Sequence, residues 1–247
     1  MHSIDKGSQI AKDGFNNEDD IIKKFNNWKV DIEAQKWLQI MEYQLDDIEL
    51  VQAFKVSGFK TDVQVQVSIK LKSIIEVQNL QLKLVKNKKG FNQIDKRWID
   101  KYVEMWSIPP EVTEILKHYS GELKPYIAKP KDSRRMFANE FSEHQQNLVL
   151  NWLENNRTLI VNDILKGRGK HSAEWILVTL TVKKDAEWTL KPINIAINHF
   201  SQGNVFITKR GNFTIGRITM QRKGGDGGRV TANMLQFKIN PAELFEL

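Results

Sequence analysis

Three residues in the first third of the chain have side chains that suit metal-assisted cleavage of a phosphodiester: Asp62, Gln81 and Lys83. In the sequence, Thr61-Asp62 is followed, after eighteen residues, by Gln81-Leu82-Lys83. Side chains two apart on a strand point to the same face, so Gln81 and Lys83 would project together. If their strand pairs as a hairpin with one that begins at Asp62, a carboxylate, an amide oxygen and an ammonium group meet at one place.

Magnesium is the metal ion that this set of donors suits. It prefers hard oxygen ligands and keeps several of its waters, so a few protein oxygens suffice. We expect Asp62 to be the main ligand, with the Gln81 side-chain oxygen and the Leu82 carbonyl as further ligands. Lys83 cannot bind the cation, and we expect it to orient the attacking water and neutralise charge on the phosphate. Glu18, at the start of the first predicted helix, could reach the same ion or its water shell.

By itself this group of residues is not specific. Asp and Lys on adjacent strands also occur on any solvated strand face, and acidic residues favour the first turn of any helix. The interpretation therefore depends on the elements that would position the residues and on the segments that follow them.

Hydrophobic periodicity predicts the elements that would position these side chains. Apolar residues at helical or alternating spacing predict helices over 17–28 and 32–41 and strands over 51–56, 62–70 and 80–85. A further helix is predicted to run from Ile94 to Trp106 and to end before Pro109 and Pro110. Helix, three strands and helix, in this order, are typical of the catalytic core of a nuclease.

Sequence patterns in the second half of the chain predict a lobe that contains both helices and strands. Asp132 and Ser142 are predicted to cap two successive helices. Strands are predicted over 175–182, 205–208, 213–221 and 234–239. Because lysines and prolines gather in the segment 122–132, we expect a connection there, with a catalytic lobe over residues 1–128 and a second lobe over residues 129–247.

Composition favours an anionic partner. The chain of 247 residues has a formal net charge of +7 and a pI of about 9.4, so nucleic acid is the usual candidate, although a merely basic soluble protein is also compatible. The absence of cysteine excludes disulfides and thiolate metal sites. The N-terminus lacks the apolar core of a signal peptide and no stretch reaches the length of a membrane span, so we expect a soluble, cytoplasmic protein without a membrane partner.

Two basic segments have residue types that contact DNA. In 86–96, lysines can bind phosphates and amide side chains can pair with base edges, while Phe91 is either a core residue or an apolar wedge between base steps. In 221–238, glycines and basic residues allow a close approach to a partner, although a flexible basic hairpin is the simpler explanation. The candidate DNA-contacting residues are Lys89, Phe91, Asn92, Gln93, Lys96, Arg134, Arg168, Gln221, Arg222, Lys223, Asp226, Arg229, Asn233, Gln236 and Lys238.

Nothing in the sequence indicates a nucleotide cofactor. The glycines form no phosphate-binding loop of the nucleotide type, and the five histidines have no metal-ligand spacing. We therefore expect Mg²⁺ as the cofactor and assign no residue to cofactor binding.

Several strings of residues carry a resemblance to the type II restriction endonucleases, and within them to the HinPlI family that cuts G/CGC. These strings are more specific than the catalytic group and together extend over nearly the whole chain. They are 11–15, 89–96, 134–137, 151–154, 166–169 and 221–238.

The resemblance implies an α/β fold of the PD-(D/E)XK superfamily, with a mixed central sheet flanked by helices and an additional mixed α/β DNA-recognition lobe. It implies metal-site roles for Asp62 and Gln81 and the lysine role for Lys83. In the broader superfamily Pro precedes the aspartate and an acid stands in place of Gln81. Here Thr61 and Gln81 stand instead, so weaker metal binding is expected and Glu18 could supply the further acid.

The resemblance also implies how the protein would act. One active site per chain would nick the strands of double-stranded DNA in sequence, giving 5′ phosphates and a two-base 5′ overhang. The protein would be a monomer or weak dimer, with a cognate DNA methyltransferase acting separately. Two other functions stay open: a DNA repair or resolvase nuclease of the same superfamily, and a DNA-binding protein without catalysis.

Overall fold

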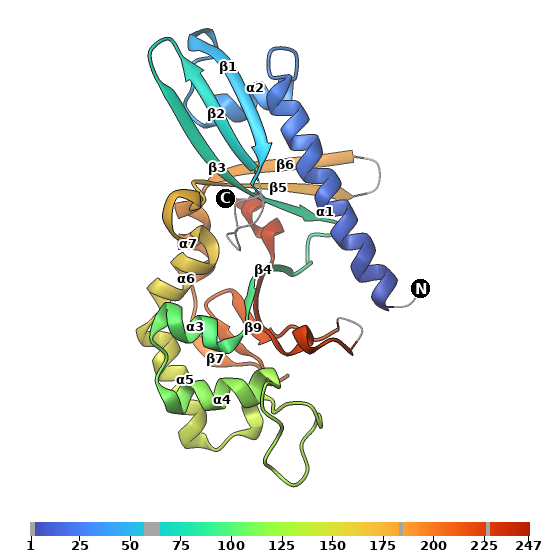
Figure 1. Cartoon of the computed structure of the whole chain (residues 1–247), viewed down its shortest axis with the longest axis vertical. Helices are drawn as coiled ribbons and strands as arrows, with labels where there is room; N and C mark the ends of the chain where they lie inside the picture. Colours follow the sequence, from blue (N-terminus) through green and yellow to red (C-terminus); the bar gives the residue numbers. More distant parts are fainter. Residues whose placement is uncertain (1–2, 57–64, 183–184, 226–227) are drawn as a thin grey trace. The chain divides into compact units, whose positions relative to one another are not determined.

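The chain contains two compact units, each assembled from separate segments (Figure 1). The computed structural model describes residues 3–56, 65–182, 185–225 and 228–247. Unit 1 comprises Met1–Ile4, Gln93–Ile164 and Ile197–Ile239, and unit 2 comprises Asp5–Asn92, Leu165–Ala196 and Asn240–Leu247. The expected assignment of catalysis to 1–128 and of DNA recognition to 129–247 stays a prediction.

Unit 2 is built on one mixed five-stranded sheet. The strands lie in the order β1-β2-β3-β5-β6, and only β3 and β5 pair in parallel. A parallel pair requires a long crossover, which the chain between these two strands supplies. Their bounds are β1 (Ile48–Lys55), β2 (Val65–Leu71), β3 (Ile75–Val85), β5 (Trp175–Val182) and β6 (Asp185–Pro192).

Two helices, α1 (Ser3–Asn26) and α2 (Ile32–Ile40), pack their apolar sides against one face of this sheet. Asp31 caps α2 by accepting a hydrogen bond from a backbone N–H of its first turn at 2.9 Å. Phe25 and Trp37 pack with ring centroids 5.2 Å apart, and Leu80 and Leu82 of β3 belong to the same buried cluster. The face of β3 that carries Leu80 and Leu82 is therefore turned toward the helices.

Unit 1 combines helices with a second sheet in the order β4-β10-β9-β8-β7. Tyr102 and Trp106 stack at 4.6 Å, and Phe237 meets both rings edge-on at 5.5 and 5.9 Å. Tyr119 packs on Phe213 at 5.0 Å. These aromatic contacts join helices to strands that are about a hundred residues away in the sequence.

The strands of the second sheet are β4 (Asn92–Arg97), β7 (Val205–Ile207), β8 (Phe213–Ile215), β9 (Ile218–Arg222) and β10 (Leu235–Ile239). The remaining helices are α3 (Ile99–Trp106), α4 (Pro110–Ser120), α5 (Glu143–Asn155), α6 (Arg157–Lys166) and α7 (Ile193–Ser201). None of the helices in the described part of the chain has the length and apolar character that crossing a membrane requires.

Several predicted elements are confirmed. The helix at 32–41 and the strand at 175–182 correspond to α2 and β5. Ser142 caps α5 in a capping box, in which its hydroxyl accepts from the backbone N–H of Gln145 and the Gln145 side chain accepts from the backbone of Ser142. Such local signals depend on residues only a few positions apart.

The predicted helix over 94–106 was wrong at its start. Residues 92–97 form β4, and α3 begins only at Ile99, so Ile94 is buried on a strand. A short apolar run can serve a helix or a strand. Here the pairing of β4 with β10, which lies far along the sequence, decided between them.

Asp132 does not cap a helix. Its carboxylate instead accepts from the backbone N–H of Arg134 at 3.0 Å and pairs with the side chain of that residue. Short acidic side chains readily form such local bonds in turns. The expected strand over 213–221 is also divided, because Gly216 adopts a positive φ of 57° and turns the chain between β8 and β9.

Candidate active site

Strand β3 presents Gln81 and Lys83 on the same face of the unit 2 sheet. Leu80 and Leu82, which alternate with them, are buried in the core with α1 and α2. Successive side chains on a strand point to opposite faces, so Gln81 and Lys83 project from the face away from these helices. The strand thus brings an amide and an ammonium group to the same side.

The side chain of Gln81 is buried without hydrogen bonds. The residue is 0% exposed, and neither Oε1 nor Nε2 has a hydrogen-bond partner among the residues that the structure describes. An unpaired buried polar group costs about 1–3 kcal/mol, and for this reason native proteins pair nearly all of them. An oxygen that is buried and unpaired is available to a bound cation or to water.

Asn79, which lies on the same face of β3, shows the contrasting situation. Its side chain accepts a hydrogen bond from Gln66 at 2.7 Å and donates to the carbonyls of Lys170 and Ser172, both at 3.1 Å. Its backbone N–H donates to the carboxylate of Glu174 at 2.9 Å. The absence of partners at Gln81 is therefore not a general property of this face.

Asp62, the carboxylate of the predicted group, lies outside the residues that the structure describes. The description resumes at Val65, which pairs with Leu80, the neighbour of Gln81. The predicted antiparallel pairing of the two strands is confirmed over β2 and β3. The role of Asp62 stays a prediction.

Two acidic residues of α1 pair with lysines at the ends of strands. Glu18 pairs with Lys55, which also lies 4.3 Å from the ring centroid of Phe15. Asp13 pairs with Lys86, and the Lys86 ammonium group holds the pKa of the Asp13 carboxyl below its usual value. Both ion pairs fasten α1 to the sheet.

Glu18 lies over the other face of the sheet from Gln81 and Lys83. Its partner Lys55 is opposite Val65, and Val65 is opposite Leu80, so these three residues share the face that the helices cover. Gln81 projects to the opposite face. The described residues therefore bring Glu18 to Lys55, and its contribution to a metal site stays a prediction.

The turn that follows β3 is held by two side-chain amides. Asn240 donates to the carbonyl of Lys88 at 3.0 Å, and Asn92 donates to the carbonyl of Leu84 at 2.9 Å. Phe91, which lies between Lys88 and Asn92 in the sequence, is 51% exposed. Of the two roles considered for Phe91, a core position is therefore excluded.

In unit 1, two residues predicted to read bases, Asn233 and Gln236, form hydrogen bonds with residues at the end of β9. Asn233 accepts a hydrogen bond from the Arg222 guanidinium at 2.6 Å. Gln236, which is 3% exposed, donates to the carbonyls of Arg222 and Lys223 at 3.4 and 3.3 Å. Gln221 lies opposite Gln236 in the ladder of β9 and β10.

The other predicted DNA-contacting residues differ in their surroundings. Arg134 forms a two-point ion pair with Asp132 at 2.8 and 2.9 Å. Burial lowers the pKa of Lys238, and Gln93 is partly buried in β4. Asp226 lies outside the described residues. The exposed members of the whole predicted set are Lys89, Phe91, Lys96, Arg134, Arg168 and Arg229.

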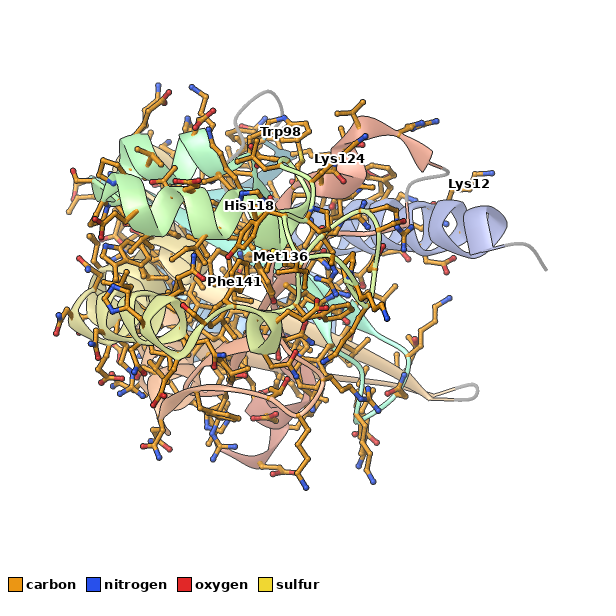
Figure 2. The ribbon with its side chains drawn as sticks, turned by 90° about the horizontal axis from the view of Figure 1, so that it is seen from below. Lys12, Trp98, His118, Lys124, Met136 and Phe141 are labelled. Carbon is orange, nitrogen blue, oxygen red and sulfur yellow. The ribbon has the colours of Figure 1, made fainter. Side chains whose placement is uncertain are left out.

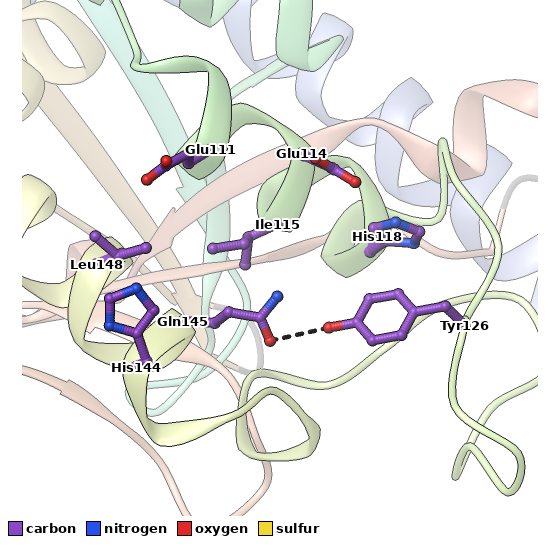
Figure 3. Close-up of a pocket in the computed structure, with 8 residues that line it drawn as sticks. All are labelled: Glu111, Glu114, Ile115, His118, Tyr126, His144, Gln145 and Leu148. Atoms are coloured by element: carbon purple, nitrogen blue, oxygen red, sulfur yellow. Dashed lines mark hydrogen bonds between the residues drawn. The ribbon is translucent and has the colours of Figure 1, made fainter.

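A pocket in unit 1 contains none of the predicted catalytic residues (Figure 3). Glu111, Glu114 and His118 of α4 face His144 of α5 across it. Among the described residues no group of three or more acidic or histidine side chains is arranged to hold a metal ion. This pocket therefore has no counterpart in the predicted chemistry.

The sequence from residue 41 to residue 245 matches the model of the R.HinP1I restriction endonuclease family. The chain belongs to this family. The solved structure of the restriction endonuclease MspI in complex with its cognate DNA is similar, with a TM-score of 0.66 and 15% sequence identity, over 96% of this chain and 93% of that one. No match was found among curated proteins.

Membership of the R.HinP1I family identifies the protein as a type II restriction endonuclease, an enzyme that hydrolyses DNA at specific sites. The likeness to MspI confirms the expected mixed α/β fold of the PD-(D/E)XK type. Restriction endonucleases of this kind generally use a divalent metal ion. Both findings agree with the resemblance that the sequence strings indicated.

Sequence reasoning missed Asn79 and Gly121 as residues that shape the candidate sites. Asn79 lies just before the predicted strand over 80–85, whereas β3 begins at Ile75, so the predicted start of the strand left it out. The position of Gly121 is apparent only when the segments around it are folded. Its φ is +90°, and a Cβ there would lie 2.7 Å from the carbonyl oxygen of Arg134.

Proposed function

We propose that this R.HinP1I-family enzyme is a Mg²⁺-dependent endonuclease that cuts double-stranded DNA at G/CGC, with Gln81 and Lys83 at the centre of its active site. The buried, unpaired amide of Gln81, on the same strand face as Lys83, is the observation that carries the assignment. Asn79, on the same strand face, has its polar groups paired, so we explain the unpaired amide of Gln81 by a ligand that completes it.

The residues at this place fit a magnesium ion. The Gln81 oxygen and the Leu82 carbonyl are hard donors, and Asp62 would add the charge that magnesium requires. Two residues, and therefore three Cα–Cα steps, separate Asp62 from Val65, so covalent geometry limits their Cα distance to about 11 Å. When bound, the metal ion would polarise the phosphate and lower the pKa of a bound water.

Lys83 would act on the phosphate and on the water without binding the metal. Its ammonium group projects from the face that carries Gln81, where it would orient the attacking water and offset the charge that develops on the phosphoryl oxygens. Glu18 would contribute a further acid only by leaving its ion pair with Lys55. We therefore assign Glu18 a secondary role.

Double-stranded DNA is the substrate that the basic residues favour. The net charge is +7, and the exposed Lys89, Lys96, Arg168 and Arg229 offer contacts to phosphates. MspI, which shares the fold, was solved with its cognate DNA. We extend DNA binding to this chain, as a monomer or weak dimer that nicks the two strands in sequence and leaves a two-base 5′ overhang.

Sequencing of fragment ends after digestion of a known plasmid with Mg²⁺ tests the proposal. We expect every end to map to GCGC, with a 5′ phosphate and the overhang of two bases. Ends at a different fixed sequence would disprove the target site. Preferential cleavage of a branched substrate over plain duplex would instead support a repair or resolvase nuclease, and protection of the plasmid by methylation at GCGC would indicate a separate methyltransferase as partner.

Replacement of Phe91 by alanine is expected to weaken cleavage of the target without affecting folding. Because Phe91 is 51% exposed, its removal should change the free energy of unfolding by no more than about 0.5 kcal/mol. If the ring inserts between base steps, its loss removes the support for a deformed duplex. Cleavage of a GCGC plasmid and thermal unfolding measure the two effects, with Phe206→Ala, also exposed, as the control. Equal cleavage by the two variants would argue against the insertion.

A further inference from the structure

Three arginines of unit 1 gather where the segment after α4 meets the end of β9. They are Arg134, Arg135 and Arg222, here called the guanidinium cluster. Gly121 lies between their segments: a Cβ there would be 2.7 Å from the Arg134 carbonyl oxygen and 3.3 Å from both Arg222 Nε and Asn233 Oδ1. Only a glycine lets these groups approach one another so closely.

The segment that carries Arg134 and Arg135 is anchored to α4 (Figure 2). The His118 ring donates from Nδ1 to the carbonyl of Lys124 at 2.7 Å, and the backbone N–H of Met136 donates to the carbonyl of His118 at 2.9 Å. The backbone of Arg135 also donates to Asp132 at 3.2 Å, which closes a tight turn. The two arginines are therefore presented by an ordered turn.

Two guanidinium nitrogens of the cluster are buried without partners. Arg222 Nη2 donates to Asn233, but Arg222 Nε has no hydrogen-bond partner among the described residues. Arg135 stacks over the rings of Phe137 and Tyr119, at 4.0 and 5.7 Å from their centroids, and its Nη1 is likewise unpaired in the described part of the chain. Charged donors left unpaired are costly, so an acceptor is expected to complete them.

The charge of the cluster is only partly balanced. Asp132 is the carboxylate of this turn, and Arg134 engages both of its oxygens. Burial, followed by the charges of Arg134 and Arg135, lowers the pKa of Arg222. Glu140 is a second carboxylate of this segment and accepts from the backbone N–H groups of Lys131 and Phe137. Three guanidinium groups beside two carboxylates still leave an excess of positive charge.

We propose that the guanidinium cluster binds a phosphate of the DNA backbone, and that Asn233 and Gln236 position Arg222 instead of reading bases. This inference rests on the proposed function and specifies one contact of its DNA-binding surface. Guanidinium groups match the geometry of phosphate oxygens. A phosphate there would accept hydrogen bonds from guanidinium groups of the cluster and would offset the repulsion within it.

The hydrogen bonds of the two amides favour positioning over base reading. The oxygen of Asn233 is occupied by the Arg222 guanidinium, and the nitrogen of Gln236 is directed to the backbone carbonyls of Arg222 and Lys223. Reading adenine requires both the oxygen and the nitrogen of an amide. In each amide, one of these two groups already forms a hydrogen bond with Arg222 or Lys223.

The test compares binding of labelled duplexes with and without GCGC, in calcium buffer over a range of salt concentrations. The variants Arg135→Gln and Arg222→Gln are each expected to weaken the binding of both duplexes by the same factor. Each should also reduce the slope of log K against log salt by about 0.9, the loss of one phosphate contact. The matched control is Arg210→Gln, an exposed arginine of the same unit, and Arg135→Lys should retain most of the slope.

An unchanged slope, or a loss confined to the GCGC duplex, would overturn the phosphate assignment. For the positioning role, Asn233→Ala should weaken the binding of both duplexes equally and reduce the salt slope. A fall of about tenfold or more in preference for GCGC would instead make Asn233 a base-reading residue. If the wild-type protein shows no preference for GCGC, the proposed target fails, while the salt slopes still decide the phosphate contact.

Discussion

Replacement of Lys83 by alanine is expected to lower the rate of DNA cleavage by about 10²–10³-fold, the effect typical of removing one charged or hydrogen-bonding group from a transition state. Lys83 projects from the same face of β3 as Gln81 and is only partly buried. Because alanine is compatible with a strand position of this kind, folding should be retained. Single-turnover cleavage of a GCGC duplex with Mg²⁺ measures the loss.

Binding of the same duplex separates this chemical role from a general contribution of charge. In the presence of Ca²⁺ the Lys83→Ala protein should bind within a few fold of the wild type, because one phosphate contact among many contributes little to the total affinity. Lys72→Ala serves as the control, since this lysine lies in the turn between β2 and β3 and its side chain is 79% exposed. Cleavage by Lys83→Ala at the rate of Lys72→Ala would remove Lys83 from the active site.

Replacement of Gln81 by methionine is expected to abolish cleavage and to stabilise the protein in the absence of divalent ions. Methionine has a similar length but no groups that need hydrogen bonds, so it removes an unpaired buried amide that costs about 1–3 kcal/mol. For a chain of this size each kcal/mol corresponds to about 2–4 °C in Tm. Thermal unfolding in EDTA and cleavage in Mg²⁺ measure the two effects.

The response to metal distinguishes a ligand from a merely buried amide. The wild-type protein should gain stability when Mg²⁺ is added, because binding to the folded state adds to its free energy of unfolding, and Gln81→Met should gain less. If both proteins respond equally to Mg²⁺, Gln81 is not a ligand. If methionine lowers the stability in EDTA, the amide has a structural partner.

The variant Gln81→Glu restores the acid that the broader superfamily carries at this position. Without metal the buried carboxyl should have a raised pKa, so this variant should be most stable below that pKa and lose stability as the pH rises through it. Added Mg²⁺ should offset the loss at neutral pH. Unfolding followed in EDTA and in Mg²⁺ at several pH values tests whether the stability falls as the pH rises. A variant whose stability does not depend on pH would contradict the prediction.

The sequence by itself determined the elements whose signals are local. Alternation over 80–85 predicted the strand β3 and the common face of Gln81 and Lys83, because this periodicity depends only on the geometry of an extended chain. The cap at Ser142 followed from residues three positions apart. The class of enzyme was indicated by the longer strings of residues that resemble type II restriction endonucleases, and the family match agrees with it.

Only the tertiary structure decided the features that depend on distant segments. Asn79 finds its partners at Lys170 and Ser172, whereas Gln81 finds none in the described part of the chain. Arg222 meets Gly121 and Asn233, and β4 pairs with β10. Local periodicity carries no information about contacts between residues that are far apart in the sequence, because these contacts form only when whole helices and strands pack together. For this reason the candidate catalytic pair was visible in the sequence, but the unpaired amide and the guanidinium cluster were not.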